Sequence, residues 1–165
     1  LQVVGRLGVG LDNIDVPACE ARGIAVFPAT GANDLSVAEY VITAALVLLR
    51  RAWFATSRVA AGEWPRTELM GRELAGKRLG LVGYGAIARV TCRMGRDLGM
   101  SVAAYDPLLP ADHPAWVGAL RQALPELLAT SDVVSLHVPL TDATRNMIDA
   151  AAITANEIAV IGRAP

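Results

Sequence analysis

The sequence predicts an α/β fold, in which a doubly wound parallel sheet carries helices on both faces and follows a strip of a second domain. Two observations lead to this prediction. A short apolar run at residues 78–82 breaks into glycines and resumes with helical character at Ala86. From there, strand-like and helix-like segments alternate along the chain, which is the pattern of a parallel sheet wound with helices.

The turn after the first of these strands has the spacing of a dinucleotide-binding fingerprint. Gly83 and Gly85 occupy its first two glycine positions, and Ala88 stands at the third, where a small residue lets helix and strand pack closely. Gly83 permits the tight turn and Gly85 lets the backbone approach a pyrophosphate. The amides of Ala86 and Ile87 open a helix whose N-terminus attracts anions. Taken alone, this spacing also fits an ordinary strand–helix turn.

An acidic residue follows at the distance that a dinucleotide site requires. A helix and a strand at residues 101–105 lead to Asp106, 18 residues after Ala88. A carboxylate at this strand end accepts hydrogen bonds from a ribose diol and repels a 2′-phosphate. Because Pro107 and its neighbours supply no basic partner for a phosphate, we predict NAD rather than NADP. The alternative for Asp106 by itself is a turn or cap role. Fingerprint and carboxylate together predict a Rossmann-type domain.

Composition and charge exclude several classes of protein. Hydrophobic residues make up 53% of the 165 residues and the mean hydropathy is +0.40, so we expect a substantial core. The net charge of −1, without a basic stripe, argues against nucleic acid as a partner. The longest apolar run, residues 41–49, is far shorter than the ~20 residues of a membrane-spanning helix, so no membrane partner is expected. Cys19 and Cys92 lack metal-ligand spacing, so we predict no metal site and a reducing, cytoplasmic setting.

The first part of the chain predicts a small α/β unit followed by a long helix. Its glycine-spaced loop is a place where backbone amides can face a ligand. The long helix is apolar around much of its circumference, as expected of a helix buried between layers. The expected elements are a strand at 1–4, the loop at 5–12, a helix capped at 13–15 that runs to 21, a strand at 24–27, a cap at 31–34 and a helix at 36–57.

The second part of the chain predicts the sheet itself. The pattern breaks at residues 60–65 and resumes before the fingerprint strand. Residues 137–141 follow a strand directly, and the carboxyl ends of such strands are where open α/β sheets bind ligands. The expected elements are a strand at 78–82, a helix to 98, a strand at 101–105, a helix at 125–129, a strand at 133–136, a helix at 144–152 and a strand at 158–161.

Four motifs occur in an order and spacing that together cover nearly the whole chain. They are Gly-Arg-Leu-Gly-Val-Gly-Leu-Asp-Asn-Ile-Asp at 5–15, Ser-Val-Ala-Glu at 36–39, Gly-Tyr-Gly-Ala-Ile-Ala at 83–88 and Ser-Asp-Val-Val-Ser-Leu-His-Val-Pro-Leu-Thr at 131–141. On these motifs the chain resembles the D-isomer-specific 2-hydroxyacid dehydrogenases, the family that includes D-3-phosphoglycerate dehydrogenase. The resemblance implies an oxidoreductase that transfers hydride between NAD and a 2-hydroxy or 2-oxo acid.

The resemblance also implies a division of the chain. Residues 1–35 would be the C-terminal part of a substrate domain, residues 36–73 a connector helix and linker, and residues 74–165 an NAD-binding Rossmann domain that is incomplete at its C-terminus. Because both ends of the chain fall in strand-like runs, we expect a piece of a longer protein.

Specific residues take roles under this resemblance. The amides of Val9 and Gly10 would face the substrate carboxylate. Ala86 and Ile87 would hold the pyrophosphate and Asp106 the ribose. A strand-end side chain satisfied by backbone is the alternative for His137, which is not the family's catalytic acid. The residues expected at the cofactor site are Gly83, Tyr84, Gly85, Ala86, Ile87, Asp106, Pro107 and, along the nicotinamide-side wall, His137, Val138 and Pro139.

The end of the chain departs from the family pattern. Such dehydrogenases carry an Asn-x-x-Arg-Gly segment after the strand predicted at 158–161, and its arginine binds the substrate. Here the sequence reads Gly-Arg-Ala-Pro, so Arg163 is the candidate for that arginine, with a solvent-facing arginine as the alternative. The family's catalytic Glu–His pair lies further along and is absent from this chain. We therefore expect the chain to be inactive on its own.

The sequence leaves open two alternatives to an active dehydrogenase, and it suggests a second copy of the chain as a partner. The same fold resembles NAD-sensing corepressors that bind partner proteins without catalysis, and a truncated remnant is the other alternative. Related enzymes dimerise through the nucleotide-binding domain. The helix from Ser36 and the stretch from Trp53 to Trp64 would suit such a homodimer, although both could equally pack in the core.

Overall fold

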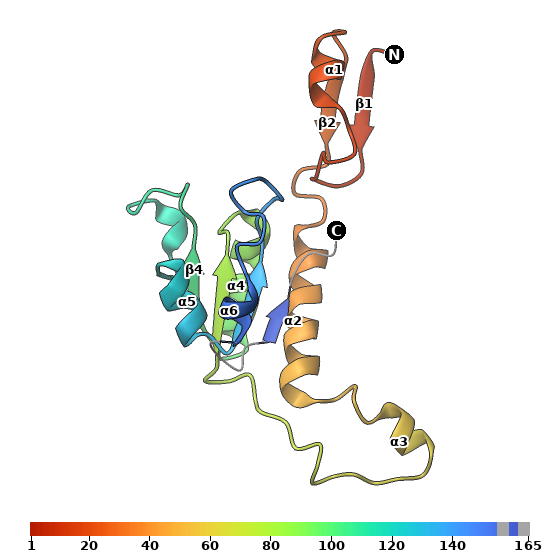
Figure 1. Ribbon diagram of the computed structural model, residues 1–165, viewed down its shortest axis with the longest axis vertical. Coiled ribbons are helices and arrows are strands. Elements are labelled where there is room, and N and C mark those ends of the chain that lie inside the picture. The colour runs from red at the N-terminus through yellow and green to blue at the C-terminus, as the bar shows by residue number, and fades with distance from the viewer. Residues whose placement is uncertain (155–158, 162–165) are drawn as a thin grey trace.

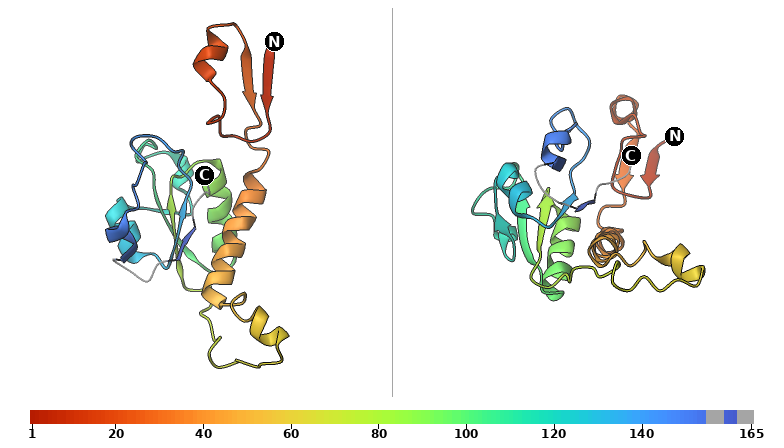
Figure 2. Two further views of the ribbon diagram at one scale, coloured as in Figure 1. Left: turned by 45° about the vertical axis from the view of Figure 1, so that its right-hand side comes forward. Right: turned by 60° about the horizontal axis from the view of Figure 1, so that its bottom comes forward.

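The computed structural model describes residues 1–154 and 159–161, which form a small lobe, a central α/β body and a projecting arm (Figure 1, Figure 2). The lobe contains β1 (Val3–Arg6), α1 (Val16–Glu20) and β2 (Ala25–Pro28). Its two strands pair in parallel, with Val4 opposite Val26. The Asp15 carboxylate caps α1 by accepting the Ala18 N–H at 2.9 Å, as the sequence predicts.

Helix α2 (Asp34–Arg50) leaves the lobe and packs along α4 of the body. It ends seven residues before its predicted end, because Arg51 adopts a left-handed conformation with φ 53° and stops the helix. The helix is expected to be buried between layers, but only one face is buried, since Tyr40 is 65% exposed and Leu35 58% exposed. The face that packs on the body consists of Ala38, Val41, Ile42, Ala45 and Leu49.

The body is built on a five-stranded parallel sheet in the order β5-β4-β3-β6-β7. Strand β3, which leads into the fingerprint, is central and pairs with β4 on one side and β6 on the other. The ligand-binding ends of three strands therefore meet at its carboxyl end. The strands are β3 (Arg78–Val82), β4 (Ser101–Tyr105), β5 (Leu120–Arg121), β6 (Val133–Leu136) and β7 (Ala159–Ile161).

Helices cover both faces of this sheet, which confirms the predicted doubly wound fold. Helices α4 (Ala86–Asp97) and α2 pack on one face around Leu79 and Leu81, both fully buried. Helices α5 (Leu124–Thr130) and α6 (Ala150–Thr154) lie on the other face, where Val82 joins a second apolar cluster. Alternate residues of β3 thus serve opposite layers, and each buried leucine contributes about 2 kcal/mol of hydrophobic stabilisation.

The helix predicted at residues 144–152 begins later than expected. Thr144 Oγ1 donates to the Pro139 carbonyl at 2.6 Å and accepts the Thr141 N–H at 2.8 Å, which holds the chain in turns after β6. Threonine hydroxyls commonly compete with helix formation in this way. Helix α6 therefore starts only at Ala150.

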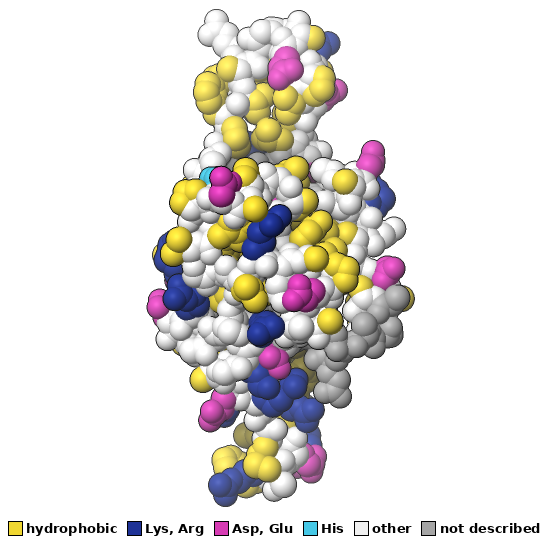
Figure 3. Space-filling view, turned by 90° about the vertical axis from the view of Figure 1, so that its left-hand side faces the viewer, with side chains coloured by type: hydrophobic (Ala, Val, Ile, Leu, Met, Phe, Trp, Pro, Cys, Tyr) yellow, Lys and Arg dark blue, Asp and Glu magenta, His cyan; other side chains and the backbone are white. Residues whose placement is uncertain are grey.

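The arm comprises residues 51–72 and includes the short helix α3 (Thr56–Ala60). It projects from the end of α2 away from the body, at the bottom of Figure 1 and Figure 3. Arg58 joins its two limbs by ion pairs of 2.7 Å with both Glu63 and Glu68. Within residues 1–154 and 159–161, no helix has the length and apolar character needed to cross a bilayer.

Candidate functional site

The fingerprint loop lies wedged between the carboxyl ends of β4 and β6. Gly83 has φ +87°, and its N–H donates to the Tyr105 carbonyl at 2.7 Å. A Cβ atom on Gly83 would lie 2.8 Å from the His137 carbonyl oxygen, so no other residue fits here. A Cβ atom on Gly85 would meet no atom within 4 Å. The loop is therefore tightly packed beneath Gly83 and open above Gly85.

Helix α4 begins at this open side. Gly85 is its N-cap residue, and no side chain caps the helix. The first amides of a helix lack partners within it, and the helix dipole adds a partial positive charge at this end. The N-terminus of α4, with Ala86 and Ile87 as its first residues, therefore fits a phosphate group.

Asp106 lies beside the loop at the end of β4. One carboxylate oxygen accepts the Tyr84 N–H at 2.9 Å, and the other accepts the Leu108 N–H at 2.9 Å. The turn role that the sequence leaves open for Asp106 is therefore present, and it lies next to the nucleotide fingerprint. Pro107 continues the chain away from this point.

The side chain of Tyr84 is buried beneath the loop. Its ring stacks on Trp116 with centroids 5.2 Å apart and an interplanar angle of 10°. Burial raises the pKa of the Tyr84 hydroxyl above its usual value. Only the backbone of Tyr84 is thus available at the cofactor side, and its N–H already bonds to Asp106.

A cavity of about 890 Å³ opens between the lobe and the body. The body contributes the segment after β6, where the His137 N–H donates to the Val82 carbonyl at 2.7 Å. The lobe contributes its glycine loop. Among the residues that the sequence assigns to the site, Val9, Gly10, Ile87, His137, Val138 and Pro139 line this cavity.

The remaining predicted cofactor residues lie at the ends of β3 and β4. Of these residues, Gly83 and Tyr84 are buried, Asp106 is partly exposed, and Gly85, Ala86 and Pro107 are exposed. Arg163 lies outside the described residues. The structure thus brings the lobe loop, the start of α4 and the segment after β6 together around one cleft.

Unpartnered polar atoms are concentrated in this cleft. Among the described residues, five side chains carry a buried polar atom without a hydrogen-bond partner, and four of them line the cavity. A buried polar group without a partner costs about 1–3 kcal/mol, so such groups mark places where a ligand or water completes the bonding. The four are Arg6 through Nε, Asn33 through Oδ1, Ser135 through Oγ and His137 through Nε2.

Arg6, Asn33 and Ser135 are site residues that the sequence analysis missed. The Arg6 guanidinium bonds to the Leu7 carbonyl and lies beside Gly8, where a Cβ atom would come within 3.2 Å of it. Asn33 is the N-cap residue of α2, within the cap predicted at residues 31–34, but its side chain makes no cap hydrogen bond. For Arg6, the signal available in the sequence was its position as a basic residue within the glycine-spaced loop at residues 5–12.

His137 sits in this cleft as a neutral imidazole. Burial lowers the pKa of His137 from 6.5 to about 4. No carboxylate offsets this lowering of the pKa, so the imidazole is uncharged at neutral pH. Its free nitrogen can accept or donate one hydrogen bond to a bound molecule.

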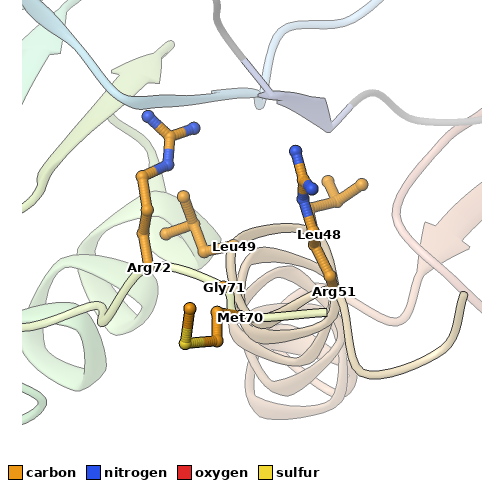
Figure 4. A pocket seen from close by; sticks show the side chains of 6 residues that line it. All are labelled: Leu48, Leu49, Arg51, Met70, Gly71 and Arg72. Carbon is orange, nitrogen blue, oxygen red and sulfur yellow. The ribbon is translucent and has the colours of Figure 1, made fainter. Parts of the chain in front are cut away.

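A second cavity, of about 360 Å³, lies at the far end of α2. The Arg51 and Arg72 guanidinium groups flank it and point in the same direction (Figure 4). None of the residues predicted from the sequence lines it. No group of metal-binding side chains occurs within the described part of the chain.

The fold and the cleft define a dinucleotide-binding protein of the Rossmann type. The family model for the NAD-binding domain of D-isomer-specific 2-hydroxyacid dehydrogenases matches residues 42–161. The chain therefore belongs to the D-isomer-specific 2-hydroxyacid dehydrogenases, and its cofactor is NAD. The resemblance noted from the four motifs is confirmed.

Known relatives agree with this assignment. The chain is 56% identical over 154 residues to (S)-sulfolactate dehydrogenase of Chromohalobacter salexigens, covering 93% of this chain and 50% of the relative. It is 39% identical over 162 residues to hydroxypyruvate reductase of Thermotoga maritima, covering 98% and 52%. D-lactate dehydrogenase of Aquifex aeolicus, solved with NAD and lactic acid, superposes with a TM-score of 0.86 at 32% identity, covering 98% and 49%. The chain thus spans about half the length of these relatives.

Proposed function

We propose that this chain forms the cofactor-binding half of an NAD-dependent dehydrogenase that interconverts an anionic 2-hydroxy acid and its 2-oxo acid. The observation that carries the proposal is the single cleft in which the start of α4, the segment after β6 and the lobe loop meet. NAD, when bound, supplies the site that accepts or returns a hydride. The protein's part is to orient the two molecules, exclude water and polarise the acid.

The proposed cofactor contacts follow the geometry of the body. The amides of Ala86 and Ile87 hold the pyrophosphate at the start of α4, where no side chain competes. Asp106 accepts the ribose hydroxyls and disfavours a 2′-phosphate. His137, Val138 and Pro139 form the nicotinamide-side wall, with the neutral imidazole able to hold a polar group of the cofactor.

The proposed substrate contacts come from the lobe. The amides of Val9 and Gly10 receive the carboxylate, and Arg6 adds a positive charge beside the same loop. The nitrogen of Arg6 without a partner and the free Asn33 oxygen provide two more polar groups. An acid with a second anionic group, such as the sulfolactate of the relative from Chromohalobacter, suits this cation. Proton transfer would need a general base in addition to these lobe residues.

The proposed domain division keeps the boundaries given by the sequence. Residues 1–35 belong to the substrate domain and residues 74–165 to the NAD-binding domain. The packing of α2 on α4 supports treating the connector in residues 36–73 as part of the nucleotide-binding unit.

The relatives are dehydrogenases, so the corepressor alternative is not favoured. The free thiols of Cys19 and Cys92 support the proposed cytoplasmic setting.

Calorimetric titration tests the proposal. We expect the purified chain to bind NADH at least about tenfold more tightly than NADPH, and (S)-sulfolactate to bind the NADH complex. Arg6→Ala should weaken sulfolactate binding by about tenfold or more and leave NADH binding unchanged. Arg22→Ala, on the exposed surface of the same lobe, is the matched control. Equal sulfolactate affinity in both variants would exclude Arg6 from the substrate site.

A further inference from the structure

The carboxylate of Asp106 already serves the protein's own backbone. Its Oδ2 accepts the Tyr84 N–H and its Oδ1 accepts the Leu108 N–H, both at 2.9 Å. Tyr84 stands between the two fingerprint glycines. The side chain proposed for the ribose is therefore also bonded to the loop that faces the phosphates.

Other contacts hold the loop around this bond. The Gly83 N–H donates to the Tyr105 carbonyl at 2.7 Å, and the Tyr84 ring stacks on Trp116. Both contacts fix the loop from below. Of these three contacts, only the hydrogen bond from the Tyr84 N–H to Asp106 involves a charged side chain. Hydrogen bonds to charged groups are about twice as strong as neutral ones.

Gly85 is the position where this support matters. It has an extended backbone and no atoms within 4 Å of a built Cβ, so packing does not restrain it on the open side. Its orientation follows from Tyr84, the preceding residue. Since Gly85 caps α4, the direction in which the first helical amides face depends on the same link.

We propose that Asp106 is a positioning residue for the phosphate loop as well as a ribose contact. Through the Tyr84 N–H it sets the orientation of the loop before the cofactor binds, so the adenosine and phosphate halves of the site are coupled through one carboxylate. The ribose contact rests on the proposed function, whereas the positioning role rests on the bond to Tyr84.

Reduced nicotinamide mononucleotide separates the two roles, because it has a phosphate but lacks the adenosine ribose. The affinities of the full chain for this mononucleotide and for NADH are measured by calorimetry. Asp106→Ala removes both backbone bonds, so we expect the mononucleotide to bind at least about tenfold more weakly. Asp106→Asn keeps one oxygen that can accept the Tyr84 N–H, so mononucleotide binding should remain within about threefold of the parent while NADH binding falls about tenfold or more.

The control is Asp112→Asn, an exposed carboxylate further along the same segment, which should change neither affinity. Unchanged mononucleotide binding in Asp106→Ala would overturn the positioning role, even if NADH binding is lost. Unchanged NADH binding in Asp106→Asn would instead contradict the ribose contact. If Asp106→Ala fails to fold, as judged by circular dichroism, Asp106→Ser takes its place, because its shorter hydroxyl keeps the site polar and cannot replace both bonds.

Discussion

At the scale of single residues, the two fingerprint glycines are required for different reasons. Gly83 has a positive φ and no room for a Cβ atom, whereas Gly85 has φ −76° and open space around it. The first is needed for the fold, whereas we propose that the second lets the cofactor approach the backbone. The sequence places both glycines in one motif and cannot separate these demands.

Exchange of each glycine for alanine should reveal this difference. Gly83→Ala meets the His137 carbonyl and an unfavourable φ, so we expect a loss of about 2 kcal/mol or more in the free energy of unfolding. Gly85→Ala should fold with parental stability and bind NADH at least about tenfold more weakly. Urea denaturation and calorimetry measure the two effects. A Gly85→Ala variant with full NADH affinity would show that the backbone does not approach the phosphates there.

The buried side chain of His137 makes the stability of the folded protein depend on pH. Burial lowers the pKa of His137 to about 4, below the 6.5 of an ordinary histidine, so the unfolded chain takes up a proton at higher pH than the folded chain does. Stability is therefore complete above about pH 6.5 and declines as the pH falls toward 4, by about 3 kcal/mol for this group.

Denaturation at several pH values checks this expectation. The variant His137→Gln has no titrating ring, so its stability should fall less between pH 6.5 and pH 4 than that of the parent. His113→Gln is the comparison, because His113 belongs to the loop after β4 and lies away from the cleft. An equal decline in parent and His137→Gln would assign the acid sensitivity to other groups.

At the scale of elements, boundaries follow from local bonds that the apolar pattern does not encode. The strand at residues 101–105 is predicted correctly, because an apolar run stands between a glycine and an aspartate. The end of α2 is missed, because the left-handed residue there is Arg51 rather than glycine. The start of α6 is missed, because hydroxyl bonds of Thr144 hold the preceding turn.

The end of α2 offers a test of stability. Arg51→Gly removes the strain of a left-handed arginine, and we expect the free energy of unfolding to rise by about 0.5–1 kcal/mol. Arg50→Gly lies one residue earlier, inside the helix, and should lower it by about 1 kcal/mol. Thermal unfolding of the two variants measures both changes. A destabilised Arg51→Gly variant would indicate that the arginine side chain makes a contact worth more than the strain.

At the scale of the whole molecule, more of the fold than of the candidate site could be predicted from the sequence. The doubly wound sheet, the fingerprint and the cofactor follow from strand alternation and glycine spacing. The cleft depends on how the lobe sits against the body. This brings Arg6 and Asn33 near Ser135, although 129 and 102 positions separate them from it in sequence. A local sequence pattern does not relate residues so far apart, and these three site residues were therefore not predicted.

We propose that the arm and the outer face of α2 pair with a second copy of the chain. Trp53, Phe54 and Trp64 are 73%, 61% and 80% exposed, although large apolar side chains usually lie buried. Ion pairs of Arg58 hold the arm in a defined shape, which favours a matching surface over a disordered one. A twofold arrangement would bury each arm on the neighbouring subunit.

Analytical ultracentrifugation tests this pairing. The parent chain should sediment as a dimer at micromolar concentration, and Phe54→Glu should shift it to monomer because a charge would enter the apolar contact. Val117→Glu introduces the same charge at a position that is 82% exposed on the body and should leave the dimer intact. A monomeric parent would contradict the pairing.

The placement of the tryptophans has an optical consequence. The Trp116 ring stacks on the ring of Tyr84, a residue of the fingerprint loop, whereas Trp53 and Trp64 are exposed to solvent on the arm. The first is an intrinsic fluorophore at the nucleotide loop, and the other two are fluorophores at the proposed subunit contact. Replacement of Trp53 and Trp64 by phenylalanine leaves Trp116 emission, and a Trp116→Phe chain leaves the arm emission. Nucleotide loading and subunit assembly can thus be followed as separate light signals from one protein without any added dye.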